Sequence, residues 1–151
     1  FLSRKLQLDH LCQVRFGHVS PASFYIGAAL SEAANARAFS RHLEWLGAVC
    51  AFRWFDIHDT ESLWTEERRQ EVAEAEIDGV RRADRCIFLA PGGRGKHAEL
   101  GAALVLAKPV LILSETEPRF SLFYHHVLAR RFTGNFMARL GEAARFLRDS
   151  P

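Results

Sequence analysis

The chain has 151 residues, of which 48% are hydrophobic and 25% charged, and its formal net charge is only +2. That is enough chain for one globular domain with a hydrophobic core. The small net charge argues against nucleic-acid binding through bulk charge, and no apolar run approaches the roughly 20 residues that a membrane span needs. Cys12, Cys50 and Cys86 are widely spaced, and no Cys/His cluster has metal-site spacing. We therefore expect a reducing, cytoplasmic setting and no bound metal.

The chain divides into two parts of unequal length. Residues 1–20 lack the apolar core of a signal peptide, and residues 1–22 are interpreted as an N-terminal extension. Residues 23–151 alternate between strand-like and helix-like patterns and form the predicted domain.

The first half of the domain contains two predicted strands around one helix. The apolar run SFYIGAAL (23–30) predicts a buried strand, and Ser31 is expected to cap the helix over 31–47, which ends at a glycine. The aromatic run AVCAFRWF (48–55) predicts a second strand. A polar loop over 56–60 follows it.

The middle of the domain repeats this alternation. A long helix is predicted over 65–84, beginning at a threonine that is followed by two glutamates, and a third strand over 85–90. A glycine-rich loop (91–96) leads into a helix over 97–107, and a fourth strand is predicted over 109–114.

The secondary structure predicted for the end of the domain is ambiguous except for the last helix. The segment SLFYHHVLARRF (121–132) fits either a short helix or a strand, and 135–149 predicts an amphipathic helix. Strands alternating with helices indicate an α/β fold with a parallel sheet covered on both faces. Ligands of such sheets bind beyond the carboxyl ends of the strands, here 27–31, 56–60 and 91–99.

The glycine-rich loop is the first candidate binding feature. PGGRGKH (91–97) places three glycines in four positions before a helix, where free backbone amides attract anions, and Arg94 and Lys96 add positive charge. The alternative is a strand-to-helix turn with two solvated cations. The loop matches neither of the common glycine-rich nucleotide motifs.

Glu99 is the second candidate. It lies in the first turn of the predicted helix, among small and apolar neighbours, at the ligand end of the sheet. The alternative interpretation is a favourable interaction with the helix dipole, although a solvent-facing carboxylate would serve the dipole equally well. Glu76 and Asp78 lie on the preceding helix, where most acidic side chains are simply solvated.

Four stretches together resemble the nucleoside 2-deoxyribosyltransferase family over about residues 23–148. They are FYIGAAL, EIDGVRRADRCIFLAPGGRG, HAELGAALVLAKPVLIL and LARRFTGNFMARL. The resemblance implies a flavodoxin-like, doubly wound parallel sheet of about five strands with helices on both faces. It also implies homodimers or higher homo-oligomers and an active site at the carboxyl ends of the strands.

The resemblance also implies roles for individual residues. Glu99 matches the family's nucleophilic glutamate, and Glu76 stands where the family has a helical aspartate, with Asp78 as the fallback. Tyr25 and Gly27 would border the sugar or base. The family's acidic loop residue is replaced here by a basic loop, which favours a phosphate-bearing substrate. The residues that would hold a 5′-phosphate are Gly93, Arg94, Gly95 and Lys96.

The expected function is cleavage of the N-glycosidic bond of a (deoxy)nucleoside or nucleoside 5′-monophosphate, by transfer to another base or by hydrolysis. A fixed carboxylate stabilises the oxocarbenium-like transition state or forms a sugar ester, and no cofactor is required. The expected partner is a small nucleoside or nucleotide, not a nucleic acid or a membrane. The alternatives are a nucleotide-binding sensor without catalysis, suggested by glutamate in place of aspartate at position 76, and NAD cleavage of the TIR type.

Overall fold

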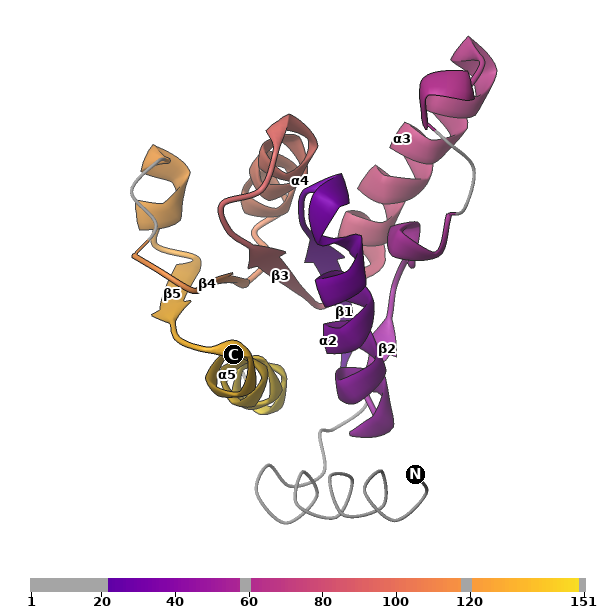
Figure 1. Cartoon of the computed structure of the whole chain (residues 1–151). Helices are drawn as coiled ribbons and strands as arrows, with labels where there is room; N and C mark the ends of the chain where they lie inside the picture. Colours follow the sequence, from indigo (N-terminus) through magenta and orange to yellow (C-terminus); the bar gives the residue numbers. More distant parts are fainter. Residues whose placement is uncertain (1–21, 58–60, 118–120, 150–151) are drawn as a thin grey trace, which may run out of the picture.

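The computed structural model describes residues 22–57, 61–117 and 121–149 (Figure 1). Five parallel strands form one sheet in the order β2-β1-β3-β4-β5. This is the flavodoxin-like order, so the predicted fold class is confirmed. The strands are β1 (Ser23–Gly27), β2 (Val49–Cys50), β3 (Arg85–Leu89), β4 (Val110–Ser114) and β5 (Ala129–Thr133).

Helices cover both faces of the sheet (Figure 1). α2 and α5 lie on one face, where the rings of Phe39 and Phe136 meet edge to face with centroids 4.8 Å apart. α3 and α4 lie on the other. The helices are α2 (Ala33–Trp45), α3 (Glu66–Arg82), α4 (Arg94–Val105) and α5 (Phe136–Arg148), and the 3-10 turns are η1 (Leu30–Glu32), η2 (Trp54–Asp56), η3 (Glu61–Leu63) and η4 (Leu122–His125).

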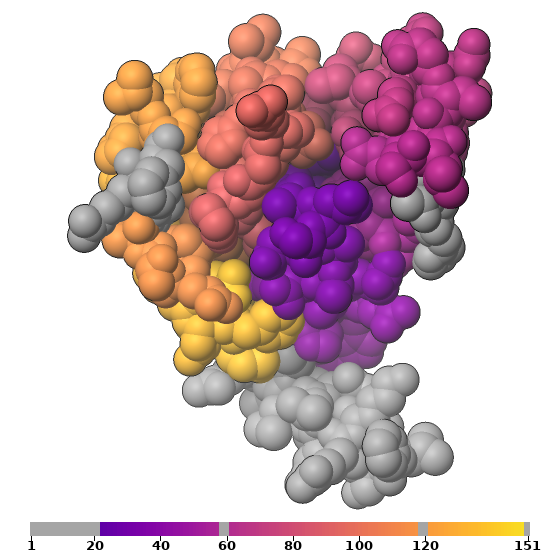
Figure 2. Space-filling view, turned by 45° about the horizontal axis from the view of Figure 1, so that its top comes forward, coloured from indigo at the N-terminus to yellow at the C-terminus, as the bar shows by residue number. Residues whose placement is uncertain are grey.

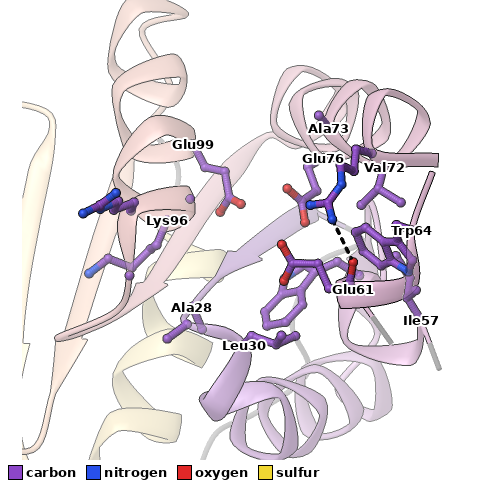
Figure 3. Close-up of a pocket in the computed structure, with 16 residues that line it drawn as sticks. Ala28, Leu30, Ile57, Glu61, Trp64, Val72, Ala73, Glu76, Lys96 and Glu99 are labelled. Atoms are coloured by element: carbon purple, nitrogen blue, oxygen red, sulfur yellow. Dashed lines mark hydrogen bonds between the residues drawn. The ribbon is translucent and has the colours of Figure 1, made fainter. Parts of the chain in front are cut away.

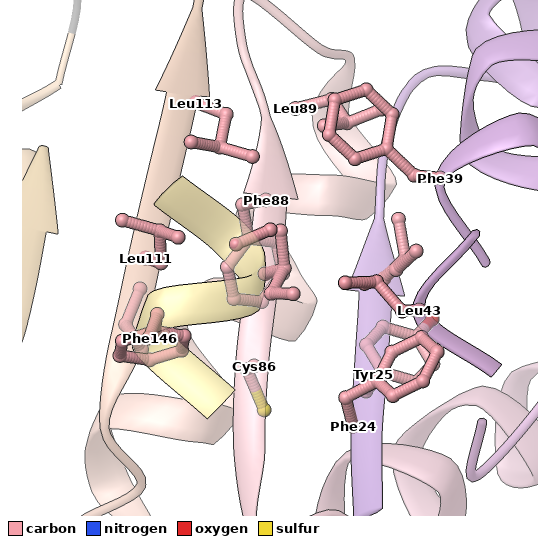
Figure 4. Packing of buried hydrophobic residues seen from close by; sticks show 14 of the residues in the cluster. Phe24, Tyr25, Phe39, Leu43, Cys86, Phe88, Leu89, Leu111, Leu113 and Phe146 are labelled. Carbon is pink, nitrogen blue, oxygen red and sulfur yellow. The ribbon is translucent and has the colours of Figure 1, made fainter. Parts of the chain in front are cut away.

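The core is built on the three central strands. Nearly every side chain of β1, β3 and β4 is buried, because helices cover both faces of a parallel sheet. Leu111 packs within this core beside Phe146 of α5, and Leu43 of α2 packs over β1 (Figure 4). Phe88 faces the other side of the sheet, beside Gly27 and Glu99. The central strands thereby hold their carboxyl ends at a fixed edge.

The second strand is much shorter than the sequence predicts. β2 contains only Val49 and Cys50, and the aromatic residues after it leave the sheet and form η2. The indole N–H of Trp54 donates to the carbonyl oxygen of Ile26 at 2.6 Å. Arg53 is held by ion pairs to Glu44 and Asp56. These side-chain contacts, rather than strand pairing, place the aromatic run beside the carboxyl end of β1.

Two helix starts also differ from prediction. Ser31 is not a cap, because it lies inside the 3-10 turn η1, and α2 starts after Glu32 without a side-chain cap. α4 begins at Arg94 instead of residue 97, so the glycine loop contains only Pro91–Gly93. Gly92 there has a φ of 63°, which suits glycine. Glu99 is consequently in the second turn of α4.

Other predictions have clear outcomes. Thr65 caps α3 by accepting a hydrogen bond from the Arg68 N–H, as the sequence predicts. The ambiguous segment 121–132 contains both alternatives, η4 followed by β5. The extension over 1–22, except residue 22, lies outside the described residues, as do Cys12 and residues 58–60.

Two kinds of feature are absent from the described ranges. No helix in them is long and apolar enough to cross a membrane. Within the same ranges, no three histidine, cysteine, aspartate or glutamate side chains are grouped so that they would hold a metal ion.

Candidate active site

A cavity of about 460 Å³ opens at the carboxyl ends of β1 and β3. Its walls are the segment after β1, the turns η2 and η3, helix α3 and the first half of α4, which meet on the face shown in Figure 2. Parallel α/β sheets bind ligands at this edge. Apolar side chains line one part of the cavity: Leu30, Trp54, Ile57, Trp64 and Val72. Charged side chains line the rest: Glu61, Arg69, Glu76, Arg94, Lys96 and Glu99.

Glu99 is a buried carboxyl group in this cavity. It is only 6% exposed, and its Oε2 atom has no hydrogen-bond partner. The helix dipole acts mainly within the first turn, so the second-turn position of Glu99 weakens the capping interpretation. Burial, and secondly the charge of Glu76, raise the pKa of Glu99 to about 8. An unpaired buried carboxyl group aimed into a cleft is typical of a functional site.

Glu76 projects from α3 towards the same part of the cavity (Figure 3). Burial, together with the charge of Glu61, raises its pKa. Burial and the proximity of the two carboxyl groups both favour the protonated form of at least one of them. The structure therefore brings together the two glutamates that the sequence singled out.

Gly27 packs against the Glu99 carboxyl group but does not line the cavity. A Cβ atom at position 27 would clash with the ring of Phe88 and with the Glu99 carboxyl group. A residue with a side chain at this place would move Glu99. The function of Gly27 in this site is therefore to leave room for the carboxyl group, and the sugar contact that the sequence predicts is absent from the cavity lining.

Tyr25 is fully buried and does not line the cavity. Its ring packs near Gly79 of α3, and its hydroxyl group has no hydrogen-bond partner. Burial and the charges of Glu99 and Glu76 raise its pKa. Tyr25 thus lies behind the two carboxyl groups, and it cannot border a sugar or base as the sequence predicts.

The start of α4 forms one end of the cavity. Gly93, Arg94 and Gly95 line it, and Arg94 is exposed at the first position of the helix. Gly93 is the N-cap residue, so no side chain satisfies the first amides of α4. All four predicted phosphate-binding residues, with Lys96 the fourth, therefore line the cavity.

Lys96 differs from the other three. Its side chain is 1% exposed, and Nζ donates to the Pro91 carbonyl oxygen at 2.6 Å and to the Tyr124 hydroxyl at 2.5 Å. Burial lowers the pKa of this amine to about 8. Because two of its three donors are used within the protein, we expect Lys96 to contribute less to phosphate binding than Arg94, although it also lines the cavity.

Asp78 is not part of the cavity either. It lies on α3 two residues after Glu76, and its half-exposed carboxylate pairs with Arg81 and Arg82. Helical geometry turns residues two apart to different faces, so only one of the two can face α4. Glu76 is the one that does.

The sequence prediction misses most of the aromatic wall. Trp54 falls in a predicted strand, and Trp64 lies in the connection before α3, which has no periodic pattern. Arg69 has the pattern of an ordinary helical residue, yet it lines the cavity and donates to the Glu61 carbonyl oxygen at 3.2 Å. The signal that the sequence does offer is two tryptophans, Trp54 and Trp64, within the short stretch that joins β2 to α3.

A doubly wound parallel sheet with paired carboxyl groups at the β1–β3 edge defines the structural class. No protein-family model matches the chain, and no curated protein matches it. Several solved structures share its fold, and two of them are enzymes with related activities. The 2-deoxyribosyltransferase of Bacillus psychrosaccharolyticus has a TM-score of 0.60 and 23% identity, over 78% of this chain and 89% of that one.

The second is the Clostridium botulinum CMP N-glycosidase BcmB. Its TM-score is 0.58 and its identity 14%, over 80% of this chain and 97% of that one. These structures confirm the fold that the family resemblance implies.

Proposed function

We propose that the protein cleaves the N-glycosidic bond of a (deoxy)nucleoside or nucleoside 5′-monophosphate. The observation that carries the proposal is the buried Glu99 carboxyl group, whose Oε2 atom has no hydrogen-bond partner and which faces Glu76 in the cleft. The fold neighbours, a 2-deoxyribosyltransferase and a CMP N-glycosidase, support the same chemistry. The aromatic wall of Trp54 and Trp64 suits a planar base.

Glu99 is the nucleophile in this proposal. A carboxylate oxygen of Glu99 bonds to the anomeric carbon as the bond between that carbon and the base nitrogen breaks. The electron pair of the broken bond stays on the nitrogen, which takes a proton from Glu76. Water then attacks the sugar ester, gives its proton to Glu76 and releases the free sugar, or a second base takes the place of water.

The proton held by the two carboxyl groups fits these roles. With a pKa of about 8, Glu99 holds the proton of the pair in the empty site at pH 7, so it must pass that proton to Glu76 before attack. The transfer leaves a carboxylate at the sugar and an acid at the base. The pair supplies both groups without a cofactor.

Arg94 supports a phosphorylated substrate. It has no ion pair among the described residues, and it stands beside the uncapped amides of α4. These groups would bind a 5′-phosphate at the opposite end of the site from the aromatic wall. A nucleoside 5′-monophosphate is therefore the favoured substrate class.

The experiment is a substrate panel. The protein and Glu99→Ala are incubated with deoxynucleosides, nucleosides, their 5′-monophosphates and NAD, and free base is separated by chromatography. We expect base release from a monophosphate by the wild type alone. Binding without base release would support the sensor alternative, and release of nicotinamide would support NAD cleavage. A second base distinguishes transfer from hydrolysis.

Self-assembly remains a proposal from the family resemblance. Val105, Leu122 and Val127 are apolar and 88%, 90% and 92% exposed, and burial in a second copy would remove that apolar surface from water. Light scattering after size-exclusion chromatography tests it, and a mass of one chain contradicts it.

A further inference from the structure

Lys96 is a buried cation held by neutral oxygen atoms. Within the described part of the chain, its Nζ hydrogen-bonds to the Pro91 carbonyl and the Tyr124 hydroxyl, and it lies 4.9 Å from the centroid of the Tyr124 ring. Burying an ammonium group is costly unless its donors are satisfied. An apolar side chain could fill the same space without the cost of burying a charge. The buried amine therefore needs an explanation, which we seek in the groups that its hydrogen bonds hold in place.

It holds the loop before α4. The Pro91 carbonyl oxygen lies 2.6 Å from Lys96 Nζ and 3.3 Å from the Tyr124 hydroxyl. The Gly93 carbonyl group is also held, because its oxygen atom lies 2.9 Å from Nδ1 of His97. A carbonyl oxygen only accepts, so this contact requires a proton on Nδ1.

His97 joins the same network. With its proton on Nδ1, the neutral ring leaves Nε2 as an acceptor 3.3 Å from the Tyr124 hydroxyl, whose single proton is donated either to this nitrogen or to the Pro91 carbonyl oxygen. The two rings are stacked, with centroids 5.8 Å apart. Lys96, His97 and Tyr124 therefore form one connected cluster, which we call the loop clamp, with contacts at both ends of the loop Pro91–Gly93.

The loop is shaped to receive the clamp. Gly92 has positive φ, and a Cβ atom there would stand 2.3 Å from Cδ of Lys96, so the lysine chain runs directly over the glycine. The next three residues of the chain, Gly93, Arg94 and Gly95, line the cavity. The clamp and the anion-binding groups share one short segment of backbone.

We propose that Lys96, acting through Tyr124 and the Pro91 carbonyl, is a positioning residue that sets the affinity of the site for the 5′-phosphate of its substrate. It does so by fixing the direction of the amides at the start of α4 and the position of Arg94. The inference rests on the proposed function. Binding energy from such preorganised donors depends on their being in place before the ligand arrives.

The test compares two ligand series on four proteins. The ligands are the four common 2′-deoxynucleoside 5′-monophosphates and the four matching deoxynucleosides. The proteins are the wild type, Lys96→Met, Tyr124→Phe and the control Lys108→Met, which removes one positive charge after the other end of α4. Dissociation constants are measured by calorimetry and KM and kcat by base release, with thermal denaturation to confirm folding.

The expected result is a loss that is selective for the phosphate. Lys96→Met raises Kd and KM for the best monophosphate about tenfold, the size of one hydrogen bond to a charged group, and changes those of its deoxynucleoside less than twofold. Tyr124→Phe, which keeps the ring, gives a smaller shift in the same direction, and Lys108→Met gives none.

Three outcomes would overturn the inference. An equal loss for both ligands would indicate a merely structural role, and no loss for either would show that the clamp does not act on the site. A wild type that binds monophosphates no better than deoxynucleosides would also refute it. Selective binding loss without base release in any protein would uphold the clamp while refuting the proposed cleavage.

Discussion

Gly27 lies directly beneath the carboxyl group of Glu99, so that a Cβ atom on residue 27 would stand 2.6 Å from Oε2. The same atom would stand 2.4 Å from the Phe88 ring, which is fully buried and cannot move away. Strand β1 thus fixes the position of a side chain on α4. Packing between a strand and a helix defines the geometry of the candidate nucleophile.

Gly27→Ala should therefore impair catalysis by moving Glu99. We expect kcat/KM to fall about a hundredfold, the cost of a displacement near 1 Å. Overpacking should also destabilise the fold by about 1–3 kcal/mol. The control is Gly101→Ala on α4, where an added Cβ meets nothing within 4 Å. It should keep full activity, and a Gly27→Ala enzyme that does the same would contradict this account.

Glu76 and Asp78 offer a matched pair of substitutions on one helix. Glu76→Gln should lower kcat by about a hundredfold or more, because it removes the acid that protonates the departing base. Asp78→Asn should leave kcat and KM unchanged, since Asp78 is half-exposed, lies outside the cavity and pairs with arginines on its own helix. Steady-state base release measures both. Equal losses would show that Glu76 has no special role.

Stability should depend on pH through Glu99. Its pKa is about 8 in the folded protein against an ordinary 4.5, so between these values the folded state holds more protons than the unfolded state. The free energy of unfolding therefore falls as pH rises through this window, by at most about 1.4 kcal/mol for each step of one in pH. Glu99→Gln removes this loss. Its melting temperature should exceed that of the wild type by more at pH 8 than at pH 5, and an equal difference at both pH values would contradict the assignment.

Tyr25→Phe should stabilise the protein or leave its stability unchanged. The buried hydroxyl group has no partner, and an unsatisfied buried polar group costs about 1–3 kcal/mol. Because the ring lies behind the carboxyl groups, KM should change little. Chemical denaturation and steady-state kinetics measure these two effects. A large rise in KM would place Tyr25 in contact with substrate after all.

The fold was predictable because its signals are local. Alternating apolar strands and capped helices identify a parallel α/β sheet, and Thr65 marks the start of α3 correctly. The predictions failed where tertiary contacts decide the local structure. The Trp54 indole leaves its predicted strand and donates to the Ile26 carbonyl oxygen, and α4 starts three residues earlier than predicted, at Arg94.

The site was partly predictable for a similar reason. Glu99 stands out as a carboxylate near the start of a helix at the ligand end of a sheet, and Glu76 is implied by the family resemblance; both line the cleft. Lys96 is a residue type that commonly binds phosphate, but the direction of its side chain depends on a hydrogen bond to Tyr124, which is distant in sequence. Trp64 belongs to the wall only because the connection before α3 folds back over the cleft.

Trapping the sugar on the protein tests the central claim most directly. A 2-fluoro-substituted nucleoside 5′-monophosphate slows the breakdown of a sugar ester more than its formation, so the ester accumulates. Mass spectrometry should show one added sugar phosphate per chain, on the peptide that contains Glu99, and none on Glu99→Gln. A wild type that releases base while the label lies on Glu76, or on no residue, would contradict the assignment of Glu99 as the nucleophile.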